Sequence, residues 1–282
     1  MQNDVITGSI SKSNIQNQCT WQLSVTDGIT TKEIGYPLTV EFNIVRNTFA
    51  SANTATFNIY NLAPSTRSNS LFFQDRFNTS ANKFVTFKAG YNGNMIVCFK
   101  GRIQECYSRR QGVETITSMQ CLDLGIPTDY VNVTYQAGTT KKEAHDNIIQ
   151  NFTHLEKGYT GSLEGVYLTP VTLEGKPLDV LNEISEGCTF IDNNKINTMQ
   201  PNECLDMGVP ILNADTGLLN TPQRSGSEII AEGIFNPNAT VGQLIEVQSK
   251  TASEFCGTFQ LTGLTHSGII SGAVAGKRTT KY

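Results

Sequence analysis

The stretch Leu38–Leu62, LTVEFNIVRNTFASANTATFNIYNL, contains the clearest strand pattern in this chain. Val40, Phe42 and Ile44 alternate with polar residues, and Phe57 and Ile59 repeat the alternation after a link of small polar residues. Period-two alternation is typical of a strand with one buried face. Small polar residues favour turns. The stretch therefore predicts two antiparallel strands joined by a short loop.

Similar segments lie on both sides of this hairpin, at intervals of about 8–12 residues that are typical of a β-barrel or sandwich. Asn92-Gly93 is a strong signal for a two-residue hairpin turn. Pro64 suits the first position of a helix, so a short helix is predicted over Pro64–Phe77. The predicted strands outside the hairpin cover residues 21–25, 30–34, 83–91, 95–99, 101–110 and 113–122.

The pattern changes after a break at residues 123–130, and we place a domain boundary near residue 130. Thr140 and Glu143 have the spacing of a capping box, and the apolar residues that follow have helical spacing. Pro177 and Gly187 fit the start and the stop of a second helix. Strands are predicted over 131–135, 166–173, 188–191 and 195–198, which gives the order β, α, β, α, β, β for a small α+β domain.

The last third returns to a β pattern. Strands are predicted over residues 229–235, 244–247 and 257–264, with a final short strand in the tail 276–282. Thr216–Gly226 is predicted to be a long loop, and His266-Ser267-Gly268 to precede a turn of small residues. The chain thus divides into residues 1–18, 19–130, 131–202 and 203–282, of which the first is predicted to be an arm ordered against a neighbour.

Two groups of residues resemble the central baseplate hub proteins of contractile-tailed bacteriophages. The first is the link Ser51–Ala55, the strand end Ile59–Leu62 and then Pro64–Arg67. The second lies in the last third and consists of Thr216–Gly226, Asn236-Pro237, Val241–Leu244 and Leu261–Gly268. The resemblance covers most of residues 20–282. It implies a mainly β chain with a tail-tube-like β-barrel, a small α+β middle domain and a second C-terminal β-barrel domain.

The resemblance also implies a function. A hub of this family would be a homotrimer that joins a hexameric tail tube, or a tube-initiator protein, to a trimeric central spike. It would adapt sixfold to threefold symmetry, contact other baseplate proteins and pass DNA or the tape-measure protein through its bore. The family has no catalytic motif, so no enzymatic activity, catalytic residue, cofactor or metal is expected. The expected location is the virion tail baseplate, after assembly in the host cytoplasm.

Composition agrees with a structural role. The chain has 282 residues, a net charge of −4 and only 16% charged residues, below the roughly 25% of typical soluble domains. Its largest basic clusters are pairs such as Arg109-Arg110 and Lys141-Lys142, which argues against nucleic-acid binding as the main task. No apolar run reaches about 18 residues, so no transmembrane helix is predicted. Residues 1–4 lack the features of a signal peptide.

The three histidines do not have the spacing of a metal site. His145 and His154 are nine residues apart rather than four, so a solvated helix face is predicted for them. His266 is predicted to be a turn histidine. The segment Gly272–Lys277 resembles a phosphate loop but has three residues between its glycines and Arg278 after the lysine. The seven cysteines, at 19, 98, 106, 121, 188, 204 and 256, include no Cys-x-x-Cys and are predicted to be buried free thiols.

Paired carboxylates support the alternative hypothesis, a tail-associated cell-wall hydrolase or carbohydrate-binding protein. The candidate pairs are Glu183 with Glu186, and Glu105 with Glu114. Glu183 and Glu186 would share one helix face, which is an ordinary place for solvated charge. Trp21 is the single tryptophan, so no aromatic groove for sugars is evident. The structural hypothesis is therefore preferred.

Overall fold

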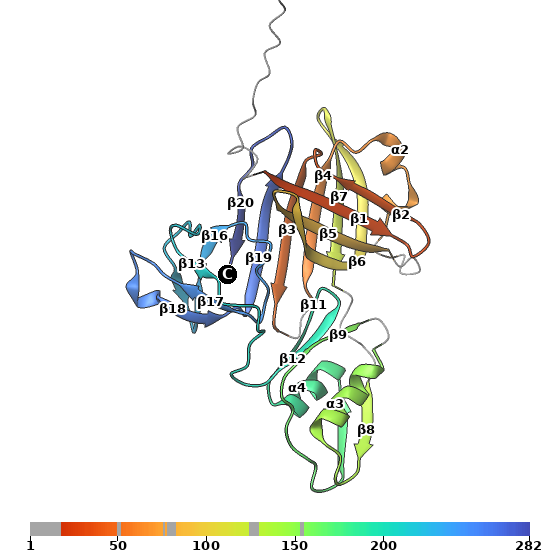
Figure 1. Cartoon of the computed structure of the whole chain (residues 1–282). Helices are drawn as coiled ribbons and strands as arrows, with labels where there is room; N and C mark the ends of the chain where they lie inside the picture. Colours follow the sequence, from red (N-terminus) through yellow and green to blue (C-terminus); the bar gives the residue numbers. More distant parts are fainter. Residues whose placement is uncertain (1–17, 50–51, 76, 78–82, 124–129, 153–154) are drawn as a thin grey trace, which may run out of the picture.

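The structure is a computed structural model that describes residues 18–49, 52–75, 77, 83–123, 130–152 and 155–282. Its main element is a ten-stranded sheet (Figure 1). In spatial order the strands are β16 (Glu232–Ile234), β20 (Arg278–Lys281), β19 (Gly263–Ile270), β3 (Val40–Asn47), β4 (Thr54–Tyr60), β7 (Glu114–Leu122), β6 (Asn94–Gln111), β5 (Phe84–Tyr91), β1 (Cys19–Thr26) and β2 (Thr31–Gly35).

The sheet curls over its own apolar face. Phe87 on β5 lies three strands away from β4, yet its ring centroid is 4.8 Å from that of Phe57 on β4 and 5.5 Å from that of Phe42 on β3. In Figure 1, β1 and β5 accordingly cross in front of β3 and β4. The alternation of the sequence explains this core, because every second side chain of β1, β3 and β4 is buried. Beyond β16, residues 217–219 extend the backbone pairing, since Leu219 N donates to Glu232 O (2.9 Å) and Ile234 N donates to Gly217 O (2.8 Å).

Two predictions for the first part of the sheet need correction. The segments 95–99 and 101–110 form one strand, β6, which continues through a register shift between Ile103 and Glu105. The helix expected over Pro64–Phe77 is shorter. It consists of α2 (Pro64–Arg67) and the 3-10 turn η1 (Ser70–Phe72), which buries Leu71 and Phe72.

The C-terminal strands belong to this same sheet. β19 pairs with β3 over eight residues, from Gly263 opposite Asn47 to Ile270 opposite Val40. β20 and β16 extend the sheet beyond β19. The domain limits drawn from the sequence stay predictions. The pairing of β19 with β3 crosses the predicted limit at residue 203. The rest of this region forms β13 (Ile211–Leu212), β17 (Leu244–Val247), β18 (Gly257–Gln260), η2 (Ser253–Phe255) and the hairpin of β14 (Gln223–Ser225) and β15 (Glu228–Ile230).

The α+β segment lies below the sheet in Figure 1. The predicted capping box is present, since Glu143 N donates to Thr140 Oγ1 (3.1 Å) and Thr140 N donates to Glu143 Oε2 (2.9 Å). The elements are β8 (Val131–Tyr135), α3 (Lys141–Gln150), β9 (Glu156–Thr160), β10 (Val171–Gly175), α4 (Pro177–Ser185), β11 (Cys188–Asp192) and β12 (Lys195–Met199).

Three details of this segment differ from the sequence prediction. β9 was not predicted and pairs in parallel with β12, and the strand expected from residue 166 begins at Val171. The left-handed residue that ends α4 is Glu186 (φ 54°) rather than Gly187. Gly187 is required for another reason, because a Cβ there would collide with the carbonyl oxygen of Met199. No helix among the described residues is long and apolar enough to cross a membrane.

Candidate assembly surfaces and buried polar centres

His145 is buried on α3, so the predicted solvated position is wrong. Its Nε2 lies 2.9 Å from Thr198 Oγ1 on β12, and its Nδ1 lies 3.3 Å from Asp146 Oδ1. Burial lowers the pKa of His145, although Asp146 opposes that shift. The side chain therefore ties α3 to β12 as a neutral hydrogen-bonding group. The helical spacing alone did not show which polar position faces inward.

His266 is also fully buried, in the middle of β19 rather than before a turn. Its Nδ1 lies 2.9 Å from Thr280 Oγ1, and the Phe235 ring packs edge-on against it at 5.3 Å. Burial, together with the positive charge of Arg46, lowers the pKa of His266 to about 3. His154 lies outside the described residues. Within the described part of the chain, no group of three or more His, Cys, Asp or Glu side chains could hold a metal ion.

The two carboxylate pairs differ in geometry. Glu183 and Glu186 are both exposed, and Glu186 accepts a hydrogen bond from Lys141. Glu105 stands opposite Gln120, whereas Glu114 stands opposite Gln111 at the far end of the β6–β7 hairpin. Gln120 and Glu114 are six residues apart on β7, which corresponds to roughly 20 Å. Glycosidase carboxylates are about 5–9.5 Å apart, so Glu105 and Glu114 do not form such a pair.

The segment that resembles a phosphate loop is a hairpin turn in the structure. Residues 272–277 form the turn between β19 and β20, where Ser271 Oγ accepts from the amides of Ala273 (3.0 Å) and Val274 (3.2 Å).

All seven cysteines are free, and burial raises the pKa of Cys98 and of Cys106 to about 12. Cys19, Cys98, Cys106 and Cys121 are buried as predicted, Cys188 and Cys204 are half-buried, and Cys256 departs from the prediction because it is exposed.

A buried ion pair that the sequence analysis missed connects the sheet to the α+β segment. Arg46 lies at the end of β3 on the same face as Phe42 and Ile44, and it is buried. Its Nε donates to Asp192 Oδ1 (2.7 Å), and its Nη2 donates to Asp192 Oδ2. Burial disfavours the guanidinium charge, but the Asp192 carboxylate outweighs that effect and raises the pKa of Arg46. The signal in the sequence is an arginine in phase with the buried residues of its strand.

Polar groups next to β4 and β7, on β6 and in the β11–β12 turn form further hydrogen bonds around this ion pair. Asn53 Nδ2 donates to Ile191 O (2.9 Å) and to Asp123 Oδ2 (3.2 Å). Asn193 Oδ1 accepts from the amide of Lys100 on β6 (3.0 Å), and the amide of Asn194 donates to Asp123 Oδ1 (3.3 Å). The end of β11 and the β11–β12 turn are therefore held against the ends of β3, β4 and β7 and against Lys100 on β6. We call this group, with Arg46 and Asp192, the polar junction.

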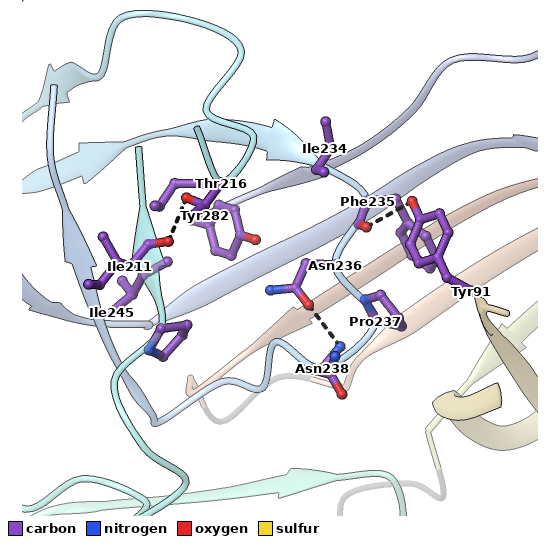
Figure 2. A pocket seen from close by; sticks show the side chains of 12 residues that line it. Tyr91, Ile211, Thr216, Ile234, Phe235, Asn236, Pro237, Asn238, Ile245 and Tyr282 are labelled. Atoms are coloured by element: carbon purple, nitrogen blue, oxygen red, sulfur yellow. Dashed lines mark hydrogen bonds between the residues drawn. The ribbon is translucent and has the colours of Figure 1, made fainter. Parts of the chain in front are cut away.

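A groove of about 320 Å³ with a mixed polar and apolar lining lies where β16 meets β13 (Figure 2). Ile211 and Ile234 belong to its lining and are 44% and 48% exposed, but the Ile234 side chain points away from Tyr282 and Ile245 (Figure 2). Tyr91 Oη donates to Phe235 O (3.1 Å), and the Asn238 amide donates to Asn236 Oδ1 (3.1 Å). The other lining residues are Pro210, Leu212, Thr216, Pro237, Ile245 and Tyr282.

Exposed apolar side chains also occupy three hairpin turns. Ile29 follows β1, Val113 follows β6 and Val274 follows β19, and each is largely exposed. Figure 1 shows the β6–β7 and β19–β20 turns at the same end of the sheet. Single exposed apolar side chains are common on protein surfaces, and they gain stability when another surface covers them. These turns are therefore candidate contacts with other subunits.

The comparison with protein families agrees with this architecture. The sequence profile of the family described as "Baseplate hub gp41" matches residues 20–267, which is most of the chain. The chain belongs to the baseplate hub gp41 family. This hub protein is therefore a structural component of the phage tail baseplate in the virion. No curated protein sequence matches it.

Solved structures with the same fold include two tail proteins and a component of a type VI secretion system. A 43 kDa tail protein of prophage MuSo2 from Shewanella oneidensis has a TM-score of 0.58 at 10% identity, with 93% of the hub protein and 96% of that chain covered. A tail protein from Neisseria meningitidis has a TM-score of 0.52 at 11% identity, with 93% and 95% covered. An Escherichia coli component of the type VI secretion system, described as similar to T4 tail proteins gp27 and gp5, has a TM-score of 0.55 at 14% identity, with 92% and 75% covered.

Proposed function

We propose that this hub protein assembles as a homotrimer at the end of the tail tube of a contractile-tailed phage. There it joins the hexameric tube to the trimeric central spike. The family match over residues 20–267 carries the proposal. Whole-chain similarity to two tail proteins supports it, because nearly all of each relative is covered.

The symmetry adaptation rests on two β sections in each chain. Three chains with two tube-like sections each present six positions to the tube and three identical units to the spike. The pairing of β19 with β3 supports a rigid version of this arrangement, because eight residues of backbone ladder join the two sections. The bore of such a ring passes DNA or the tape-measure protein.

The exposed elements have distinct roles in this ring. The sheet end β2 and the hairpin turns at Val113 and Val274 contact neighbouring subunits, because a closed ring protects sheet edges and apolar turns. The α+β segment faces outward, towards other baseplate proteins. Its helix α3 exposes Lys142 and Glu143, and α4 exposes Glu183, which suits a solvated rim.

The test is the native mass of the purified chain, alone and co-expressed with the tube and spike proteins of the same phage. The expected species is a trimer, three times the chain mass of 30.9 kDa. Val113→Asp is expected to reduce the trimer fraction, whereas Leu168→Asp is the control, because Leu168 is equally exposed on the α+β segment. A monomer in both preparations would refute the proposal.

A further inference from the structure

Three cations gather on the outward face of β5 and β6. Lys88, Lys100 and Arg102 alternate with the buried residues of their strands, so their side chains point away from the core. Lys100 is two residues from Arg102 and diagonal to Lys88, which corresponds to Cβ separations of about 6–8 Å. None of the three forms an ion pair with a described residue. We call these three residues the basic patch.

Apolar side chains stand beside these cations on the same face. Arg102 is flanked by Phe84 on β5 and by Leu122 on β7, and Lys88 stands opposite Val97 on β6. The three apolar residues are half-buried, so part of their surface is still in contact with water. Protein interfaces combine apolar area with charged groups at the rim. The basic patch therefore suits a partner that offers acidic and apolar side chains together.

The acids on this face leave the basic patch with an excess of positive charge. Glu33 on β2 accepts hydrogen bonds from Gln22 Nε2 (2.9 Å) and Ser24 Oγ (3.1 Å). Three strand spacings, about 14 Å, separate Glu33 from Lys100. Glu105 lies on β6 beyond its register shift. One nearby acid does not balance three cations.

The outward face of the β13–β17–β18 sheet offers the opposite charge. Glu246 lies on the exposed side of β17 and accepts a hydrogen bond from Gln248 Nε2 (2.7 Å). Ile211 stands beside it on β13 and is 44% exposed. Asp206 is exposed at the end of this sheet nearest Gln243. Neither acid forms an ion pair with a described residue. We call Glu246, Asp206 and Ile211 the acidic face.

The two β sections as a whole differ in charge in the same sense. Residues 19–130 contain ten basic and eight acidic residues, whereas residues 203–282 contain five basic and seven acidic residues. In Figure 1, β17 and β18 lie to the left of β19, and β5 and β6 lie to its right. The basic patch and the acidic face are therefore on different sides of one chain. Charge complementarity makes a second copy of the chain the matching partner.

We propose that the basic patch of one chain binds the acidic face of a second copy. The inference rests on the proposed trimer and names two surfaces that meet within it. Because the two surfaces differ and lie on different sides of the chain, three copies can close into a ring through this one contact. The charges specify the partner and its orientation, since contacts between like charges are costly.

Charge reversal tests this contact in whichever preparation of the natural chain is trimeric, alone or with the tube and spike proteins. Lys100→Glu with Arg102→Glu should weaken trimer association about tenfold or more, because it places acids against Glu246 and Asp206. Asp206→Lys with Glu246→Lys should have the same effect. A chain with all four reversals should recover the trimer, because opposite charges meet again. Native mass spectrometry over a dilution series measures the association.

The matched control reverses two exposed acids on α4, as Asp179→Lys with Glu183→Lys. It changes the net charge as much as the reversal of Asp206 and Glu246, but it should leave the trimer unchanged. A natural trimer that survives both sheet reversals, or a fourfold variant that does not recover, would overturn the inference and leave the trimer itself standing. A natural chain that is monomeric in every preparation would refute the trimer and this contact together.

Discussion

Strand β3 contributes side chains to both the core of the large sheet and the polar junction, but different interactions stabilise the two regions. On one face of β3, Phe42 and Ile44 enter a core of aromatic and aliphatic side chains, and two residues later Arg46 enters a buried ion pair. The core depends on burial and shape, which many apolar residues supply. The junction depends on a specific partner, because a buried charge without one is strongly destabilising. Substitutions in the two regions should therefore differ in kind.

The largest effect is expected from Asp192→Ala. This change leaves the Arg46 guanidinium buried without its carboxylate, so the free energy of unfolding should fall by about 3–5 kcal/mol. Urea denaturation measures the loss. Hydrogen exchange should show that protection is lost first in β11 and β12, which the pair holds to the sheet.

The matched control replaces both charges, as Arg46→Met with Asp192→Leu. Apolar replacement of a complete buried ion pair is often neutral or stabilising, so the double variant should be more stable than Asp192→Ala. If the double variant were as unstable as the single one, the hydrogen bonds of the junction, rather than the unpaired charge, would dominate.

The second effect is a pH dependence that originates at the boundary of the two regions, at His266. Its pKa is about 3 in the folded protein and about 6.5 in the unfolded chain, so the unfolded chain takes up the proton first as the pH falls. The contribution of His266 to the free energy of unfolding is therefore complete above pH 6.5 and decreases as the pH falls towards 3. Between pH 8 and pH 5 the loss should be about 2 kcal/mol.

Comparison with His266→Gln isolates this contribution, because His145 also has a lowered pKa and titrates in both proteins. The unfolding free energy of each protein is measured at pH 8 and pH 5. The variant should lose about 2 kcal/mol less than the natural chain over this range. Equal losses in the two proteins would show that His266 does not carry the dependence.

A smaller effect is expected from Phe57→Leu in the sheet core. Phe57 packs against Phe87 and Phe99, and leucine keeps the site apolar while removing part of the ring volume. The cost should be about 1–2 kcal/mol, well below the 3–5 kcal/mol of truncation to alanine. A loss as large as that from Asp192→Ala would remove the difference between the two regions.

The comparison also explains what the sequence could predict. Alternation predicted β3, β4 and the mainly β fold, because Phe42 and Phe57 need only an apolar environment. The capping box at Thr140 was predicted because its partners are three residues apart. The junction was not predicted, since Arg46 and Asp192 are 146 residues apart and their pairing depends on tertiary structure. For the same reason the pattern did not show that β19 joins β3 or that His145 faces inward. The groove depends on β13 and β16, whose two or three residues carry little periodicity.

The smallest effect is expected at the exposed ion pair of Lys141 and Glu186, which contrasts with the buried pair of Arg46 and Asp192. Exposed pairs are screened by water and salt, so Glu186→Ala should leave the thermal midpoint nearly unchanged. Glu186 has a φ of 54°, a conformation in which glycine avoids the cost of a Cβ. Glu186→Gly should therefore raise the midpoint by about 1–2 °C. A clear drop in both variants would mean that the exposed pair stabilises the fold, and the distinction between exposed and buried pairs would then fail in this protein.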